Sequence, residues 1–163
     1  GRPPPVASGP TAARWPGRLQ RLRRGALCAG FGGDIWLDGG DNPGAVAALA
    51  ETLREWRLGD GAPRTLHLIM AMLDNKDVEN FLAPFRSLGP EIHAVPVPHE
   101  TVAKAPERIV RTAIAQGLVA SQAADVGAAL QAISKAEAPR VLICGTLYLV
   151  GSVLATNPQD DAA

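Results

Sequence analysis

The chain has 163 residues, of which 47% are hydrophobic, 20% are charged and only 4% are aromatic. These proportions exclude an intrinsically disordered chain and fit one globular domain whose core is built from Ala, Val and Leu. With 16 basic and 16 acidic residues the formal net charge is zero, so the totals give no reason to expect a nucleic acid or a membrane as a partner.

The two ends of the chain differ in composition from its middle. Residues 1–13 are rich in Pro and Gly without periodicity, and Gly1 stands where an initiator Met is usual. We interpret this stretch as a linker or a tag-derived segment. Residues 156–163 are polar and acidic and are interpreted as a flexible tail. The globular domain is therefore expected over residues 14–155.

Cysteine usage and targeting signals bear on the compartment of the protein. The sequence holds two cysteines, Cys28 and Cys144, too few for a disulfide framework or a tetrahedral zinc site. It contains no signal-peptide pattern and no apolar run of about 18 residues. These features favour a reduced, cytoplasmic protein, and we expect a monomer.

An arginine-rich stretch precedes the first acidic residue, Asp34, and makes the start of the chain locally cationic. It contains Arg2, Arg14, Arg18, Arg21, Arg23 and Arg24. Two interpretations stay open. Either the stretch is a solvated segment of an arginine-biased protein, or at least one guanidinium binds a phosphate, for which a planar and permanently charged donor is well suited.

Beyond this stretch, short β-type runs alternate with longer helical ones. From the amino terminus onward we predict a strand at 34–37, a helix at 43–56, a strand at 65–70, a helix at 78–87, a strand at 91–97, helices at 107–116 and 126–136, a strand at 140–144 and a helix at 147–154. Asn42 as N-cap and Pro43 at the first helical position mark the start of the first helix. The alternation predicts an α/β domain with a Rossmann-like, mainly parallel sheet and helices on both faces.

Three polar clusters fall where a predicted strand gives way to a helix, at residues 38–43, 74–77 and 145–146. In a parallel sheet such clusters share one edge, where ligands gather. The first cluster combines glycines, a helix amino terminus and the carboxylate of Asp38, which suits ribose hydroxyl groups. Its alternative interpretation is a glycine turn with a helix cap and no ligand.

The other two clusters allow similar pairs of interpretations. Lys76 lies close to the start of a helix, where the helix dipole does not favour a cation. It therefore either binds an anion or is simply solvated, while Asp77 is a plausible N-cap. Thr146 places a hydroxyl after Gly145 at the end of a buried strand, either for a ligand or as a helix start.

Several familiar site patterns are missing from the sequence. It has no G-x-x-x-x-G-K-[ST] phosphate loop and no G-x-G-x-x-G after a strand, so we expect that it cannot hold a triphosphate unaided. Neither a nucleophile with a base nor a cluster with metal-ligand spacing stands out, so no metal ligands are predicted. The remaining candidates are interpreted as structural, solvated or packing residues: His67, His93, His99, Trp15, Trp36 and Trp56.

Four short sequence motifs resemble those of a known family. They are Trp15–Gln20, Trp36–Gly39 followed by Asn42 and Pro43, Met72–Asp77, and Cys144–Gly151. In order and spacing they resemble the carboxyl-terminal domain of folylpolyglutamate synthase, including the bifunctional bacterial type that is also dihydrofolate synthase, within the Mur ligase superfamily. The resemblance spans residues 15–154 and covers only the trailing third of such an enzyme.

The resemblance implies an ATP-dependent amide ligase. In that family ATP phosphorylates the carboxylate of a folate or dihydropteroate, and the amino group of glutamate attacks the acyl phosphate; Mg²⁺ accompanies the ATP. The phosphate loop, the magnesium ligands and most of the folate pocket belong to the enzyme's own amino-terminal domain. This chain is then the domain that closes over ATP, and we expect it to be inactive alone.

Site residues carried over from the family fall on the predicted sheet edge. Arg18 matches the arginine that reaches the ATP phosphates, and Asp38 matches the carboxylate near the ribose. Thr146 stands where the family usually has Ser, so a hydroxyl is retained. Lys76 and Asp77 match a motif that shapes the cleft between the domains.

Asp41 departs from the family pattern. The corresponding family motif is usually Asp-Gly-Ala-His-Asn-Pro, and in this chain Gly40 and Asp41 replace its Ala and His. A carboxylate in place of the nucleotide-facing His reverses the sign of its interaction with phosphate. Two other identities stay open from the sequence: a carboxyl-terminal domain of a peptidoglycan Mur ligase, and a non-catalytic α/β binding module.

Overall fold

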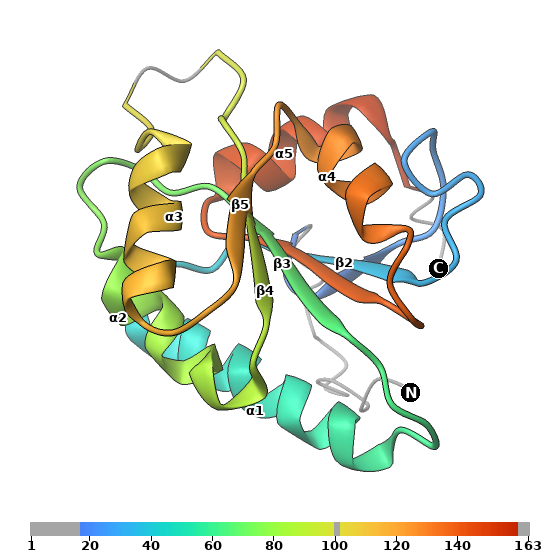
Figure 1. Cartoon of the computed structure of the whole chain (residues 1–163). Helices are drawn as coiled ribbons and strands as arrows, with labels where there is room; N and C mark the ends of the chain where they lie inside the picture. The colour runs from blue at the N-terminus through green and yellow to red at the C-terminus, as the bar shows by residue number, and fades with distance from the viewer. Residues whose placement is uncertain (1–16, 100–101, 160–163) are drawn as a thin grey trace, which may run out of the picture.

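A six-stranded sheet forms the middle layer of the described residues (Figure 1). The structure is a computed structural model that describes residues 17–99 and 102–159. The strands are β1 (Gln20–Leu22), β2 (Asp34–Asp38), β3 (Leu66–Met70), β4 (Glu91–Ala94), β5 (Ala120–Gln122) and β6 (Arg140–Cys144). Their order across the sheet is β1-β2-β6-β3-β4-β5, and every pairing is parallel except that of β1 with β2.

Helices cover both faces of this sheet (Figure 1). One face carries α1 (Pro43–Gly59), α2 (Val78–Leu82), the 3₁₀ helix η1 (Ala83–Leu88) and α3 (Pro106–Ala115), and the other carries α4 (Val126–Ile133) and α5 (Leu147–Thr156). The predicted α/β class and the predicted layers are therefore confirmed. No helix among the described residues has the length and apolar character needed to cross a bilayer.

Two apolar layers form the core because successive side chains of a strand point to opposite faces. On the α1–α3 face, Trp36, Leu68 and Leu142 contact buried residues of the helices. On the α4–α5 face, Leu37 and Ile143 do the same. The central strands β2, β3 and β6 are buried on both faces, so their sequences are mainly apolar and do not alternate with polar residues.

The central strand β6 fixes where the polar loops lie. It pairs with β2 on one side and β3 on the other, and Asp38, Cys144 and Met70 stand at the same level. The carboxyl ends of the three strands therefore form one edge, which we call the carboxyl rim. The loops that follow these strands contain the three predicted polar clusters.

The structure corrects the sequence prediction in several elements. The predicted helix at 78–87 is α2 followed by η1, because Pro84 has no N–H to continue the α-helical bonding. The predicted strand at 91–97 ends at Ala94, ahead of Pro96 and Pro98. The helix at 126–136 ends at Ile133, and β1 and β5 were not predicted.

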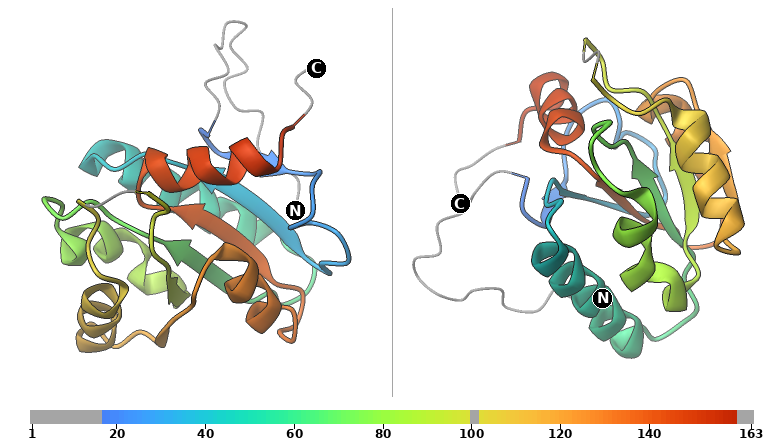
Figure 2. Two further views of the ribbon diagram at one scale, coloured as in Figure 1. Left: turned by 90° about the horizontal axis from the view of Figure 1, so that it is seen from above. Right: turned by 90° about the vertical axis from the view of Figure 1, so that its left-hand side faces the viewer.

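The last described residues are bound to the segment that follows β1 (Figure 2). The Gln159 carboxamide accepts hydrogen bonds from the N–H groups of Arg23 and Arg24 and donates one to the Arg24 carbonyl. The N–H of Leu27 donates to Asn157 Oδ1. Asn157 and Gln159 fall in the stretch that the sequence analysis interpreted as a tail, whereas residues 160–163 lie outside the described part, as do residues 1–16 with Trp15.

Candidate functional site

Close backbone approaches shape the carboxyl rim. The N–H of Gly39 donates to the Gly17 carbonyl at 2.8 Å, which joins the loop after β2 to the segment before β1. Gly145, between β6 and α5, has a φ of 107°, and a Cβ there would overlap the carbonyl oxygen of Ala71. Only glycine satisfies both conditions, so the loop after β6 lies directly against the end of β3.

Asp38 lies at the tip of β2 with its carboxylate turned inward. It is 8% exposed, and its two oxygens accept the N–H groups of Gly40 at 2.8 Å and Leu19 at 3.1 Å. Burial raises the pKa of Asp38, although these two bonds and the charge of Arg18 oppose the rise. Both oxygens keep spare acceptor capacity, but the carboxylate already holds two loops together.

Asp41 and Lys76 form an ion pair across the rim, with 3.5 Å between Asp41 Oδ2 and Lys76 Nζ. Asp41 comes from the loop after β2 and Lys76 from the loop after β3, so the first two polar clusters are in direct contact. Both side chains remain partly exposed to solvent. The carboxylate that departs from the family pattern therefore has a cation beside it.

Thr146 and Asp77 cap the helices that begin at the rim. The Thr146 hydroxyl accepts a hydrogen bond from the N–H of Tyr148 and is only 2% exposed. Asp77 accepts from the N–H of Asn80. These contacts are the N-cap roles that the sequence allowed. Burial leaves the Thr146 hydroxyl little surface for a ligand, so its demonstrated role is to start α5.

Arg18 lies at the same rim, next to Asp38, and its side chain is exposed. Its charge acts on the Asp38 carboxyl, which places the guanidinium on that side of the molecule. No described residue forms a hydrogen bond or an ion pair with the Arg18 side chain. Although Asp38 lies nearby, the N–H groups of the Arg18 guanidinium are bound to no described residue and remain available to an anion.

A pocket of about 690 Å³ opens at the rim beside the second cluster, between the loop after β3 and residues 102–108. Arg108 forms an ion pair with Asp74 at 2.9 Å, and Lys104 donates to the Asp74 carbonyl at 2.7 Å. Sequence reasoning missed Lys104 and Arg108, because the sequence places them about thirty residues beyond the cluster. The sequence signal that could have indicated them is Lys104, a cation shortly before the helix that starts at Pro106.

The amino ends of the strands carry a different charged group. Arg140 makes two 3.0 Å hydrogen bonds to the Asp60 carboxylate, and Arg64 pairs with Asp34 beside a pocket of about 440 Å³. Burial would raise the pKa of Asp34, but hydrogen bonds from Trp36 and Arg64 lower it overall. Because Arg64 and Arg140 are engaged with carboxylates, this network is assigned to stability and not to a ligand.

The open, mainly parallel sheet with polar loops and helix starts at its carboxyl ends defines a Rossmann-like α/β domain. A family model described as "Dihydrofolate synthetase, C-terminal domain" matches residues 29–156. The chain belongs to this family. The match confirms the family resemblance that the sequence motifs indicated.

Solved structures of similar fold agree with this assignment. A Mycobacterium tuberculosis folylpolyglutamate synthase complexed with ADP superposes with a TM-score of 0.74 at 21% identity, over 91% of this chain and 34% of that one. A bifunctional folylpolyglutamate synthase/dihydrofolate synthase from Yersinia pestis, complexed with AMPPNP and a Mn ion, gives 0.69 at 24% identity, over 88% and 32%. A Thermotoga maritima folylpolyglutamate synthase gives 0.63 at 26% identity, over 88% and 31%.

This chain spans about a third of the length of these solved relatives. A comparison with curated protein sequences gave no significant match. The comparisons therefore define the family and the fold.

Proposed function

We propose that this chain is the closing domain of an ATP-dependent, cytoplasmic ligase that joins glutamate to a folate or dihydropteroate through an acyl phosphate. An amino-terminal domain of the same enzyme holds most of the ATP and folate contacts. The carboxyl rim of the present domain, within residues 14–155, closes over the nucleotide. Family membership supports the kind of enzyme, and the rim supports the part that this domain plays in it.

The observation that carries the proposal is the exposed guanidinium of Arg18 beside the loop after β2. Arg18 forms no salt bridge with a described residue, whereas Asp41 and Asp74 each have a cation within 3.5 Å. A free guanidinium at the edge where parallel sheets bind ligands matches the phosphate groups of a nucleotide. Arg18 then stabilises the negative charge that develops when the phosphoryl group is transferred.

The other rim residues fit supporting roles in this proposal. Asp38 holds together the loops that carry Arg18 and Gly40, and its remaining acceptor capacity suits the ribose hydroxyl groups that the resemblance implies. Thr146 starts α5 at the same edge. Lys76 offers an ammonium group to the cleft while it is paired with Asp41.

Magnesium is assigned to the proposed amino-terminal domain. Mg²⁺ needs oxygen ligands, and it is usually held by one or two carboxylates together with substrate phosphates. At this rim Asp41 is bound to Lys76 and Asp74 to Arg108. Their cation partners make both carboxylates poor ligands for a metal ion, which supports a metal site outside this chain.

The test is Arg18→Ala in a protein that joins this chain to its amino-terminal domain, with Arg23→Ala as the matched control. Arg18 and Arg23 flank β1 at opposite ends, and both are exposed. We expect Arg18→Ala to lower kcat by ~100-fold or more, the scale of a lost charge-stabilising donor, and to leave folate binding almost unchanged. The melting temperatures of both variants and the kinetics of Arg23→Ala should match those of the unmodified protein. Equal kinetics for both variants would remove Arg18 from the site.

A further inference from the structure

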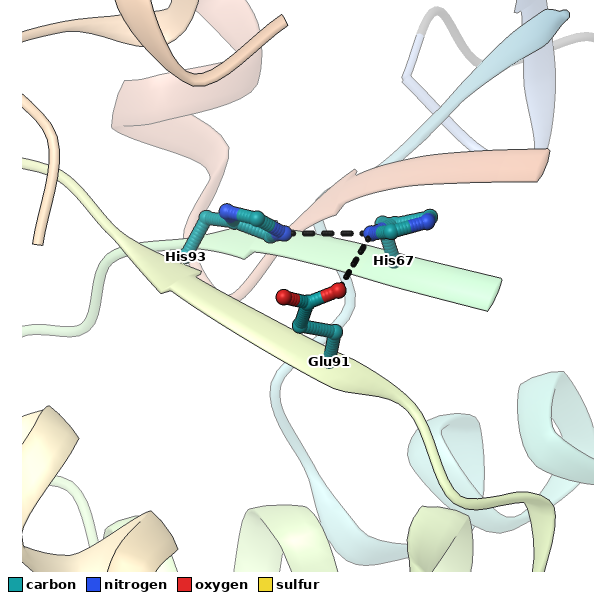
Figure 3. A group of neighbouring side chains, drawn as sticks. All are labelled: His67, Glu91 and His93. Atoms are coloured by element: carbon teal, nitrogen blue, oxygen red, sulfur yellow. Dashed lines mark hydrogen bonds and ion pairs between the residues drawn. The ribbon is translucent and has the colours of Figure 1, made fainter. Parts of the chain in front are cut away.

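On the α4–α5 face of the sheet, β3 and β4 bring together two histidines and a glutamate (Figure 3). The strand register sets His67 opposite Glu91 and Ile69 opposite His93, so all these side chains project to the same face. His67 and His93 are 2% and 5% exposed, while the Glu91 side chain is 43% exposed. We call His67, Glu91 and His93 the histidine cluster. His67 and Glu91 lie near the amino ends of β3 and β4, away from the carboxyl rim, and the cluster has no part in the proposed function.

The hydrogen bonds around His67 determine which of its ring nitrogens carries a proton. The Thr65 hydroxyl donates its single hydrogen to the Glu137 carbonyl at 3.1 Å. Toward His67 Nε2, which lies 2.9 Å away, Thr65 can therefore only accept, so Nε2 carries the hydrogen. In the neutral ring His67 Nδ1 is then a bare lone pair.

That lone pair faces two other polar atoms. His93 Nε2 lies 3.1 Å from His67 Nδ1, and Glu91 Oε2 lies 3.4 Å from it (Figure 3). A carboxylate oxygen and a bare ring nitrogen are both acceptors, so their approach is unfavourable unless a positive group lies between them. A neutral His93 can donate its Nε2–H to His67 Nδ1, but this bond leaves the Glu91 oxygen without a donor. A proton on Nδ1 or a metal ion would satisfy the carboxylate as well.

The spacing of the three donor atoms fits a metal ion. Two ligands that each lie about 2.0 to 2.1 Å from a tetrahedral zinc ion are separated by roughly 3.3 Å. The distances from His67 Nδ1 to His93 Nε2 and to Glu91 Oε2 lie on either side of this value, and all three donor atoms lie within 4.8 Å of one another. The half-exposed Glu91 side chain has room to rotate toward His93.

The environment of the two histidines also suits a metal ion. Both rings are buried, and the neutral imidazole is the form that binds a metal. The contact of Thr65 with His67 Nε2 is the kind of outer contact that orients a metal-binding histidine. The exposed side of Glu91 gives an ion a path from solvent.

We propose that the histidine cluster binds a divalent transition-metal ion, with zinc as the best match. His67 Nδ1, His93 Nε2 and a Glu91 carboxylate oxygen are the three protein ligands, and a water molecule on the Glu91 side completes the tetrahedron. Imidazole ligands select zinc over magnesium. The ion links β3 to β4, so its binding stabilises the folded chain.

The experiment is calorimetric titration of Zn²⁺ into the untagged, chelator-stripped chain under reducing conditions, with Mg²⁺ in a parallel titration. We expect one zinc ion per chain, a higher melting temperature with Zn²⁺ and no response to Mg²⁺. X-ray absorption at the zinc edge should show two imidazole ligands with oxygen neighbours at about 2.0 to 2.1 Å.

Variants localise the ion. Glu91→Gln keeps the size of a half-exposed side chain and should weaken zinc binding by at least ~10-fold, and His93→Gln should abolish it. His99→Gln, which changes an exposed histidine in a loop, is the matched control and should bind as the unmodified chain does. If His93→Gln impairs folding, Glu91→Gln decides. Absence of saturable zinc binding, or zinc binding of equal strength in the unmodified chain and Glu91→Gln, would overturn the proposal.

Discussion

Asp41 is the residue at which this chain departs from the usual motif of its family, and the structure places a cation beside it. A lone carboxylate facing phosphate would repel it. The ammonium of Lys76, 3.5 Å away, offsets the negative charge of Asp41. The pair leaves the rim locally neutral at this point, so Arg18 supplies the excess positive charge.

The first residue-scale prediction concerns Asp41→His in the longer enzyme. The substitution removes the negative charge and frees Lys76 for the nucleotide, so the KM for ATP should fall by the equivalent of about 1 to 2 kcal/mol. Steady-state kinetics at varied ATP concentrations measure the effect. Glu55→His, on the exposed side of α1, makes the same change in formal charge away from the rim and is the control.

Two results would separate the interpretations of Asp41. A lower KM for ATP in Asp41→His alone supports contact with the nucleotide. An unchanged KM, with a stability change of less than ~1 kcal/mol, would assign Asp41 to the turn before α1, in which Asn42 is the cap that accepts the N–H of Ala45.

At the scale of elements, Gly145 determines how β6 leads into α5. Its left-handed backbone and its approach to Ala71 put the start of α5 at the rim. A side chain at this position would push α5 away from β3 and displace Thr146. The geometry of the rim therefore depends on a residue that has no side chain to contact a ligand.

We predict that Gly145→Ala destabilises the chain by about 2 kcal/mol or more, because the new methyl group meets backbone and the backbone conformation is strained. Gly151→Ala is the matched control within α5, since nothing lies within 4 Å of its added Cβ. It should stabilise the chain by about 0.5–1 kcal/mol through the helix preference of Ala. Urea unfolding of both variants measures the difference, and equal shifts would contradict the packing argument.

The elements also show how far the sequence predicts this fold. The buried runs of β2, β3 and β6 are mainly apolar and are followed by polar loops, and β4 lies between Pro90 and Pro96, so these strands were recognisable. β1 and β5 have three residues each and no apolar pattern, because both are edge strands; β1 is paired antiparallel and β5 is largely exposed. Their pairing depends on the neighbouring strand, which no local pattern records.

The rim was predictable in outline and not in its contacts. The rule for parallel sheets placed Asp38, Lys76 and Thr146 on one edge, and the register agrees. The Asp41–Lys76 pair depends on the conformations of two loops. The approach of His67 to His93, which are 26 positions apart in the sequence, depends on how β4 aligns with β3. Spacing in the sequence carries neither kind of information.

For the whole molecule, the location of the charged groups predicts what the chain does by itself. Arg18 and the paired Lys76 are the cations at the rim that we assign to a nucleotide, and the sequence has no phosphate loop. We expect the isolated chain to fold, to bind ATP weakly at best, and to show neither ATP hydrolysis nor amide formation. Calorimetry and a phosphate-release assay test this expectation.

An Arg18→Ala sample distinguishes activity of the chain from that of a contaminant. Phosphate release that is equal in both samples comes from a contaminating enzyme. Robust turnover that falls in Arg18→Ala would show that the domain is catalytically self-sufficient, and it would contradict a role limited to closing over a nucleotide held elsewhere.

The location of β6 affects how the molecule is made. β2 and β3 are consecutive parallel strands in the sequence, yet they do not touch, because β6 lies between them. During synthesis both strands leave the ribosome long before Arg140–Cys144, and their facing edges stay unpaired in the meantime. Such edges are templates for strands of other chains. The nascent domain is therefore most prone to aggregate just before its last strand emerges, and any truncation ahead of Arg140 leaves it permanently in that state.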